Sequence, residues 1–219
     1  MKRLSLILLI LLTVSAARAE TYNHPDVFDK IYETNAWLYG SGTGSILEYN
    51  WGYIRFLEEF FSKHEIKSII DFGCGDWQFS QKINFDGINY TCYEVSKYVL
   101  ERNRAEFAKE NIKFEYTPDD WDNIESADLI VVKDVLQHFD NKTIQVFINK
   151  VLPKFKYALI TNDVLPAEYI NIEIEVGDFR PLDLRKEPFN VPMAEAFTYR
   201  GGASELKTCF LLVNSKSGQ

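Results

Sequence analysis

Asp71-Phe72-Gly73-Cys74-Gly75-Asp76 is the stretch that decides the fold, because it follows directly on a short apolar run at residues 66–71. Two glycines within three positions let the backbone turn sharply and approach a ligand without a side chain in between. Ligands of open α/β sheets bind outside the carboxyl ends of the strands, which is where such a turn lies. The turn therefore predicts a ligand site at the end of a first parallel strand.

Downstream of this turn, apolar runs alternate with segments of helical character. The predicted strands are residues 66–71, 89–95, 112–116, 127–133 and 157–161, and the predicted helices are residues 78–83, 97–109 and 143–152. The fourth strand is the most apolar, with Leu129-Ile130-Val131-Val132 in succession. Near-continuously apolar strands that alternate with helices indicate a mostly parallel sheet covered on both faces.

The end of the chain departs from this alternation. Residues 163–194 hold four of the seven prolines and show no clear periodicity, so we expect an irregular insertion there. Two more strands, residues 196–199 and 207–213, are joined through Gly201-Gly202 and predict an antiparallel hairpin at the edge of the sheet. The expected fold is a three-layer, doubly wound α/β domain with a seven-stranded sheet, spanning residues 20–219.

Residues 1–19 have the three parts of a secretory signal peptide. Lys2 and Arg3 form a basic start, an apolar run follows, and Ala17-Arg18-Ala19 supplies the small residues of a cleavage site before Glu20. The apolar run is too short for a span of about 20 residues, so we expect no membrane anchor after cleavage. The sequence thus predicts a periplasmic or secreted protein, or a cytoplasmic one if the signal is not used.

Charge and cysteine content exclude several kinds of partner. The formal net charge is -8, and cleavage removes three basic residues and no acid, which makes it about -11. Such an acidic chain is a poor ligand for the phosphates of nucleic acid. The three cysteines, Cys74, Cys92 and Cys209, favour small buried side chains over a disulfide framework, and no spacing of cysteines or histidines suggests a metal site.

Residues 20–64 read as a helical lead-in to the sheet, with an amphipathic helix expected at residues 51–61. Gly40, Gly42 and Gly44 make residues 39–45 a loop, because glycine is costly in helices and strands. From its position we interpret this loop as a possible lid over the ligand.

Gln78 decides between two families of glycine-turn ligands. A dinucleotide-binding turn would have a third glycine at that position, whereas the chain has Trp77-Gln78. A nicotinamide oxidoreductase is therefore disfavoured. The turn instead resembles motif I of class I S-adenosylmethionine-dependent methyltransferases, whose signature is an acidic residue followed by x-Gly-x-Gly.

The resemblance extends in motif order over about residues 66–162, and the closing hairpin continues it to about 213. Glu94 ends the second strand, where the family has an acid that holds the ribose hydroxyls of the cofactor. Asp119, or nearly as well Asp120, follows the third strand, where the family contacts adenine. Residues 128–138 resemble the motif IV strand and the helix start after it. The cofactor-binding residues implied for S-adenosylmethionine are Asp71, Gly73, Cys74, Gly75, Asp76, Trp77, Glu94, Asp119, Asp120, Lys133, Asp134 and Val135.

Four residues are candidates on the acceptor side. His138 and Asp163 follow the fourth and fifth strands and are the candidate catalytic bases, although a base is needed only if the acceptor must lose a proton. His138 equally suits a role in shaping the pocket, and Asp163 a solvated turn. Tyr39 and Arg180 are candidate substrate contacts, with an ion pair from Arg180 to Asp183 as the structural alternative.

The resemblance implies transfer of a methyl group to a small molecule or to an exposed polar group. Export leaves a second hypothesis open, because S-adenosylmethionine is made in the cytosol. Under that hypothesis the domain is catalytically inactive and binds a nucleoside ligand or a protein partner. The sequence indicates neither the oligomeric state nor the acceptor.

Overall fold

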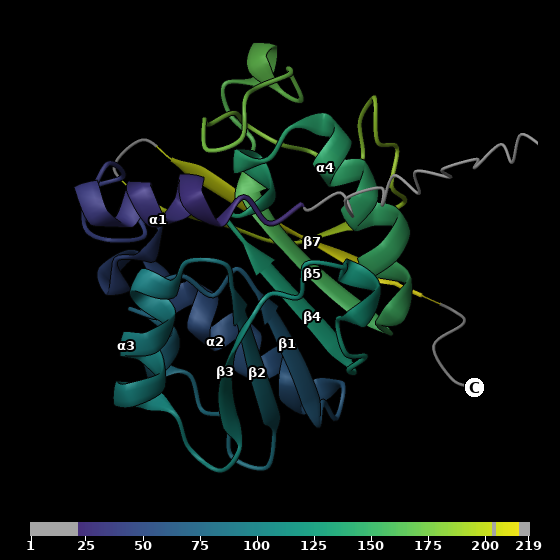
Figure 1. Cartoon of the computed structure of the whole chain (residues 1–219). Coiled ribbons are helices and arrows are strands. Elements are labelled where there is room, and N and C mark those ends of the chain that lie inside the picture. Colours follow the sequence, from purple (N-terminus) through teal and green to yellow (C-terminus); the bar gives the residue numbers. More distant parts are fainter. Residues whose placement is uncertain (1–21, 203–204, 215–219) are drawn as a thin grey trace, which may run out of the picture.

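The computed structural model describes residues 22–202 and 205–214, so the predicted signal peptide at residues 1–19 lies outside the described part. Seven strands form one sheet in the order β3-β2-β1-β4-β5-β7-β6 (Figure 1). The strands are β1 (Ser68–Phe72), β2 (Asn89–Glu94), β3 (Ile112–Tyr116), β4 (Leu129–Lys133), β5 (Tyr157–Asp163), β6 (Ala194–Arg200) and β7 (Leu206–Val213). The predicted doubly wound fold with a closing hairpin is confirmed.

The order of the strands places the glycine turn at the switch point of the sheet. β1 pairs in parallel with β2 on one side and with β4 on the other, and the chain reverses its direction of travel across the sheet between them. β5 continues the parallel part, while β7 is antiparallel to both β5 and β6. The carboxyl ends of β1, β2, β4 and β5 therefore meet at one edge, where a crevice is expected.

Alternating side chains of each strand enter two separate cores, one on each face of the sheet. Ile69 packs with the helix α2 (Leu47–Lys63), whose apolar side chains Tyr53, Leu57 and Phe61 face the sheet. Ile70 points to the other face. That face is covered by α4 (Asn141–Val146) and the turns after it, and α1 (Pro25–Thr34) and α3 (Lys97–Phe107) complete the layers (Figure 1).

Two predicted helices are shorter or less regular than the sequence indicates. Residues 78–83 contain only a 3-10 turn at Ser80–Lys82. Residues 143–152 begin as α4, widen to a π-helical turn at Phe147–Val151 and end in a 3-10 turn at Leu152–Lys154. Pro153 has no backbone N–H to donate, which prevents the α-helix from continuing through this position.

The segments outside the alternating pattern close over the crevice. The loop after α1 contains Gly40 and Gly42, whose φ angles of 75° and 83° suit glycine. Residues 164–193, between β5 and β6, contain no strand and are irregular, as the sequence indicates, but they are not a surface appendage, because Leu182, Leu184 and Phe189 are buried in the core beside α4.

All three cysteines are free thiols, and Cys92 and Cys209 are fully buried, as the sequence indicates. Among the described residues no helix has the length and apolarity needed to cross a membrane.

Candidate functional site

A cavity of about 900 Å³ opens at the carboxyl ends of β1, β2, β4 and β5. Its wall combines the glycine turn, the ends of the four strands, the loop after α1 and the segment after β5. Ligand pockets are roughly 300–1,000 Å³, so this cavity lies at the large end of the range.

The glycine turn brings bare backbone to the cavity wall. Gly73 has a φ angle of 76°, and a Cβ atom there would lie 2.5 Å from Cγ2 of Val135. Gly75 has a φ angle of 57°, and its Cβ would lie 2.5 Å from Oγ of Ser41. Both positions thus exclude a side chain for conformational and steric reasons. The turn fits a ligand that approaches the backbone closely.

Glu94 fixes the turn to the end of β2. Its Oε2 accepts a hydrogen bond from the backbone N–H of Gly75 at 2.9 Å, and its Oε1 accepts from the N–H groups of Val95 and Ser96 at 2.8 and 2.9 Å. Burial raises the pKa of Glu94, although these three hydrogen bonds oppose the shift. Because a carboxylate offers roughly four acceptor positions, about one remains on Oε2 for a ligand hydroxyl.

Asp71 lies behind the turn and also lines the cavity. The hydroxyl of Tyr90 donates to its Oδ2 at 2.6 Å. Burial raises the pKa of Asp71 to about 7, against the opposing effect of this hydrogen bond. Burial thus makes this carboxyl keep its proton to a much higher pH than a solvent-exposed aspartate does.

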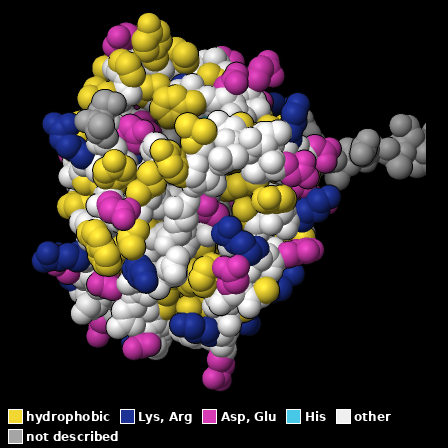
Figure 2. Space-filling view, turned by 90° about the vertical axis from the view of Figure 1, so that its left-hand side faces the viewer, with side chains coloured by type: hydrophobic (Ala, Val, Ile, Leu, Met, Phe, Trp, Pro, Cys, Tyr) yellow, Lys and Arg dark blue, Asp and Glu magenta, His cyan; other side chains and the backbone are white. Residues whose placement is uncertain are grey.

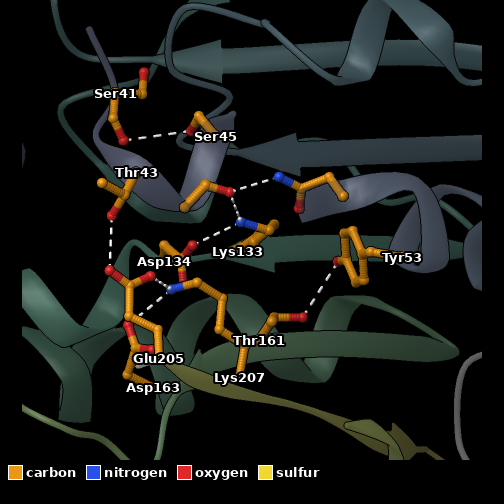
Figure 3. Close-up of polar contacts among 12 residues, drawn as sticks. Ser41, Thr43, Ser45, Tyr53, Lys133, Asp134, Thr161, Asp163, Glu205 and Lys207 are labelled. Carbon is orange, nitrogen blue, oxygen red and sulfur yellow. Dashed lines mark hydrogen bonds and ion pairs between the residues drawn. The ribbon is translucent and has the colours of Figure 1, made fainter. Parts of the chain in front are cut away.

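Two lysines and three acids form a buried charge cluster at the other end of the cavity (Figure 3). Nζ of Lys133 lies 2.6 Å from Oδ2 of Asp134, and Nζ of Lys207 lies 3.0 Å from Oδ1 of the same carboxylate. Lys207 also contacts Oδ2 of Asp163 at 2.8 Å and Oε2 of Glu205 at 3.7 Å. Each lysine is thus already paired with a carboxylate.

The pKa values in this cluster follow from the balance of burial and pairing. Burial alone would raise the pKa of Asp134, but Lys133 and Lys207 outweigh it and bring it to about 2. Burial alone would lower the pKa of Lys207, but Asp134 and Asp163 outweigh it and the pKa is raised. Burial raises the pKa of Asp163 despite Lys207. At neutral pH Lys207 and Asp134 are therefore both charged.

His138 lines the cavity as an uncharged ring. Its Nδ1 lies 2.8 Å from the carbonyl oxygen of Asp178, so Nδ1 carries the proton and Nε2 has the free lone pair. The ring packs on Trp37 with centroids 4.6 Å apart. Burial lowers the pKa of His138 to about 4, which keeps it neutral at physiological pH.

Two of the residues predicted to bind the cofactor lie outside the cavity wall although they belong to the turn. Oδ2 of Asp76 accepts hydrogen bonds from the backbone of Ser41 at 3.1 Å and from Gln78 at 2.6 Å, so it holds the loop after α1. Trp77 is buried in the core against Phe114. Trp77 is bulky and apolar, and the turn directs it beneath the sheet rather than toward a ligand.

The predicted adenine contacts are also displaced. Thr117 and Trp121 line the cavity after β3, whereas Asp119 and Asp120 are exposed and do not. Asp120 caps the next 3-10 turn by accepting from Asp122 at 3.1 Å, and it pairs with Lys150 at 3.2 Å. Short side chains that cap turns are held by the local backbone, which explains why this acid faces outward.

The structure places both predicted substrate contacts away from the cavity wall. Tyr39 is 62% exposed beside the turn. Arg180 is buried, and it donates to the carbonyl of Phe139 at 2.6 Å and to Asn141 at 2.9 Å. The expected pairing of Arg180 with Asp183 is wrong, because Asp183 pairs with Arg185 at 2.9 Å.

The remaining predicted residues do line the cavity, namely Asp71, Gly73, Cys74, Gly75, Glu94, Lys133, Asp134, Val135, His138 and Asp163. Lys207 and Glu205 also line the cavity but were not predicted from the sequence; they come from the hairpin more than 60 residues after Asp134. Lys207 had a signal, since it is a lone cation in the apolar strand β7. A lysine in such a run is expected to be paired when buried.

Comparisons with known proteins agree with this geometry. Residues 70–153 match the family model described as "Methyltransferase domain". No curated protein matches the chain. Among solved structures, the DhpI–SAH complex has a TM-score of 0.55 at 10% identity and covers 89% of this chain and 97% of its own.

Two further solved structures are similar. The mitomycin 7-O-methyltransferase MmcR has a TM-score of 0.51 at 12% identity, covering 74% of this chain and 54% of its own. Human N-acetylserotonin methyltransferase in complex with SAM has a TM-score of 0.53 at 12% identity, covering 74% and 51%. The chain thus spans about half the length of these two proteins, and the likeness concerns the fold.

Proposed function

Starting from the class I methyltransferase fold of this chain and the methyltransferase domain that residues 70–153 match, we propose that it binds S-adenosylmethionine and transfers its methyl group to a small molecule. The observation that carries the proposal is the single cavity that runs from the glycine turn and Glu94 to the charge cluster of Lys133, Asp134, Asp163 and Lys207. When bound, the cofactor supplies an electrophilic methyl group on a sulfonium sulfur.

The residues at the cofactor end fit such a ligand. Gly73 and Gly75 leave room that a Cβ atom would fill, so the ligand can lie against the backbone. The remaining acceptor position on Glu94 suits a ribose hydroxyl. Thr117 and Trp121 line the wall next to Glu94 and suit a flat base. Asp76 acts on the cofactor only through the loop that it holds.

Two groups at the acceptor end can receive a proton. Nε2 of His138 has a free lone pair and the ring is neutral. Oδ1 of Asp163 accepts no hydrogen bond from the described residues. A general base contributes only where the acceptor loses its proton, and positioning by the cavity accelerates the displacement in either case.

We further propose, from the pattern of residues 1–19, that the protein is exported by a cleavable signal peptide. Export favours a second candidate function, because S-adenosylmethionine is made in the cytosol. In this second reading the domain is inactive and binds a nucleoside ligand or a protein partner through the same cavity.

Calorimetric titration of S-adenosylmethionine and S-adenosylhomocysteine into the purified protein tests the proposal. We expect saturable binding that Glu94→Ala and Gly73→Ala weaken at least about tenfold, since each removes ligand contact or space. Glu115→Ala is the matched control, because Glu115 is a half-exposed acid on the neighbouring strand β3. Absence of binding by the wild-type chain would refute the proposal.

Incubation with labelled cofactor and fractionated extracts then separates the two candidate functions. Release of S-adenosylhomocysteine with one fraction supports methyl transfer. Tight binding without turnover in every fraction supports the inactive domain.

A further inference from the structure

We infer that the acceptor is an apolar or aromatic amine that binds as a cation, with its ammonium group on Oδ1 of Asp163. This inference rests on the proposed function and names the substrate class for the same cavity. Its basis is the acidic wall, the two carboxylate oxygens of that wall that have no hydrogen-bond partner among the described residues (Oδ1 of Asp163 and Oε2 of Glu205), and the apolar rim.

The charged side chains that line the cavity are mostly acidic. They are Asp71, Glu94, Asp134, Asp163, Glu168 and Glu205 against only Lys133 and Lys207. Both lysines are paired with carboxylates, and Lys133 also donates to the carbonyl of Gly44 at 2.8 Å. The described wall therefore has no free cation to bind a carboxylate or phosphate acceptor, while it attracts a positive charge.

Asp163 is the acid whose position suits an ammonium group. It lies at the carboxyl end of β5 and is 5% exposed. Its Oδ2 is held by Lys207 at 2.8 Å and by Nε2 of Gln137 at 3.3 Å, and its backbone N–H donates to Gln137 at 2.9 Å. Its Oδ1 has no hydrogen-bond partner among the described residues. A buried carboxylate oxygen without a partner is costly, and an N–H donor of a ligand would satisfy it.

Lys207 orients Asp163 without neutralising the cluster. Asp134, Asp163 and Glu205 surround Lys207, and Lys133 is the second lysine, so three carboxyl groups face two amino groups at this end of the cavity. Glu205 is held in turn by the hydroxyl of Thr43 at 2.7 Å. An ammonium group would balance the excess.

The rim of the cavity is apolar and aromatic. Leu165 and Phe179, from the segment after β5, line the cavity and are 50% and 51% exposed. The ring of His138 packs between Trp37 and Phe179, with centroid distances of 4.6 and 5.9 Å. Figure 2 views the side of the molecule that lies on the left in Figure 1, and it shows hydrophobic side chains gathered at the upper end of this side. Figure 1 draws the segment after β5 at the same end. Such a rim suits the carbon skeleton of the acceptor, and aromatic faces also favour a nearby cation.

The ammonium group first gives one proton to a base, Oδ1 of Asp163 or water, which leaves a neutral amine with a lone pair. That lone pair forms the new N–CH₃ bond while the S–CH₃ bond breaks. The electron pair of the broken S–CH₃ bond stays on sulfur. The products are S-adenosylhomocysteine and the methylated ammonium ion. No oxidant, reductant or further reactant is needed.

Binding of three probes of one size and different charge tests the inference: 2-phenylethylamine, 2-phenylethanol and 3-phenylpropionate. We expect calorimetry, in the presence of S-adenosylhomocysteine, to give the amine an affinity at least about tenfold above the alcohol, and the acid the weakest binding. Equal affinities of amine and alcohol would overturn the inference. Loss of S-adenosylhomocysteine binding itself would instead contradict the proposed function, so the two failures are distinguishable.

Asp163→Asn supplies the matched variant, because it removes the charge and keeps the shape. We expect it to abolish the preference for the amine while S-adenosylhomocysteine still binds. Glu205→Gln, which is less buried, serves if the first variant does not fold, and we expect it to reduce the preference several-fold. Glu175→Gln is the control. Glu175 is an exposed acid of the segment after β5 that does not line the cavity, so this change should leave the preference unchanged. An amine preference that persists in both Asp163→Asn and Glu205→Gln would contradict the assignment.

Discussion

The side chain of Lys207 is 2% exposed, and its ammonium group lies among the carboxylates of Asp134, Asp163 and Glu205. Removing such a partner leaves buried carboxylates without compensation, which costs more than the pair itself contributes. We therefore predict that Lys207→Met lowers the free energy of unfolding by about 3–5 kcal/mol. Urea denaturation at pH 7 measures it.

Lys150→Met is the control for this prediction. Lys150 pairs with Asp120 and Asp122 at the surface, where solvent screens the charges, so its loss should leave the unfolding midpoint unchanged. If both variants were equally stable, the charge cluster would not have the structural role assigned to it.

The buried carboxyl of Asp71 makes the free energy of unfolding depend on pH. Its pKa rises from 3.8 to about 7 on folding, so between these values the folded chain binds more protons than the unfolded chain. Stability must then fall as pH rises through this window and level off above it. We predict that Asp71→Asn removes this slope from the curve of unfolding free energy against pH. If the unfolding free energies of variant and wild type differed by the same amount at every pH from 4 to 7.5, the pKa of the Asp71 carboxyl would not be raised by folding.

At the scale of elements, the loop after α1 is held over the cavity by contacts with distant segments. The hydroxyl of Ser41 accepts from the backbone of Asp76 at 2.9 Å and lies 2.9 Å from the hydroxyl of Tyr32. Further along the loop, Thr43 bonds Glu205 and the carbonyl of Gly44 bonds Lys133. The loop thus links the cofactor end of the cavity to the acceptor end.

We predict that Ser41→Ala speeds amide hydrogen exchange in residues 39–45 several-fold, because it removes the hydroxyl that bonds the backbone N–H of Asp76 and the hydroxyl of Tyr32, and leaves only the backbone bond from Ser41 to Oδ2 of Asp76. Mass spectrometry of the corresponding peptide measures this. Ser45→Ala removes only a 3.3 Å bond within the loop and should have a much smaller effect. Equal exchange in both variants would mean that Ser41 does not hold the loop.

The strands could be predicted because each is marked by a run of neighbouring apolar residues. Many side chains of the site could not be predicted, because contacts with distant residues set their directions. β4 is a run of buried apolar residues, and the glycine turn is indicated by Gly73 and Gly75, two residues apart. Asp120 and Arg180 were predicted at the site from their positions in the sequence alone. In the structure Asp120 caps a turn and Arg180 bonds a buried backbone carbonyl, and neither lines the cavity. Lys207 reaches the cavity only through the pairing of β7 with β5, which sequence spacing does not reveal.

At the scale of the whole molecule, the cavity wall is drawn from segments between Phe28 and Lys207, so nearly the entire chain must be folded for the site to exist. A ligand that binds only the folded state then stabilises all of it, by about 2.7 kcal/mol at a concentration 100 times its Kd. For a domain of this size that raises Tm by roughly 5–10 °C. We predict this shift for S-adenosylhomocysteine in differential scanning calorimetry.

The same calorimetric measurement with NAD tests whether the turn binds a dinucleotide instead of S-adenosylhomocysteine. Gln78 stands where a dinucleotide-binding turn has its third glycine, and its amide is bonded to Asp76 and to the carbonyl of Tyr39. The position where a pyrophosphate would approach the helix start is therefore occupied by a side chain that also holds the loop. We expect NAD to leave Tm unchanged, and a shift with NAD but none with S-adenosylhomocysteine would reverse the assignment of the turn.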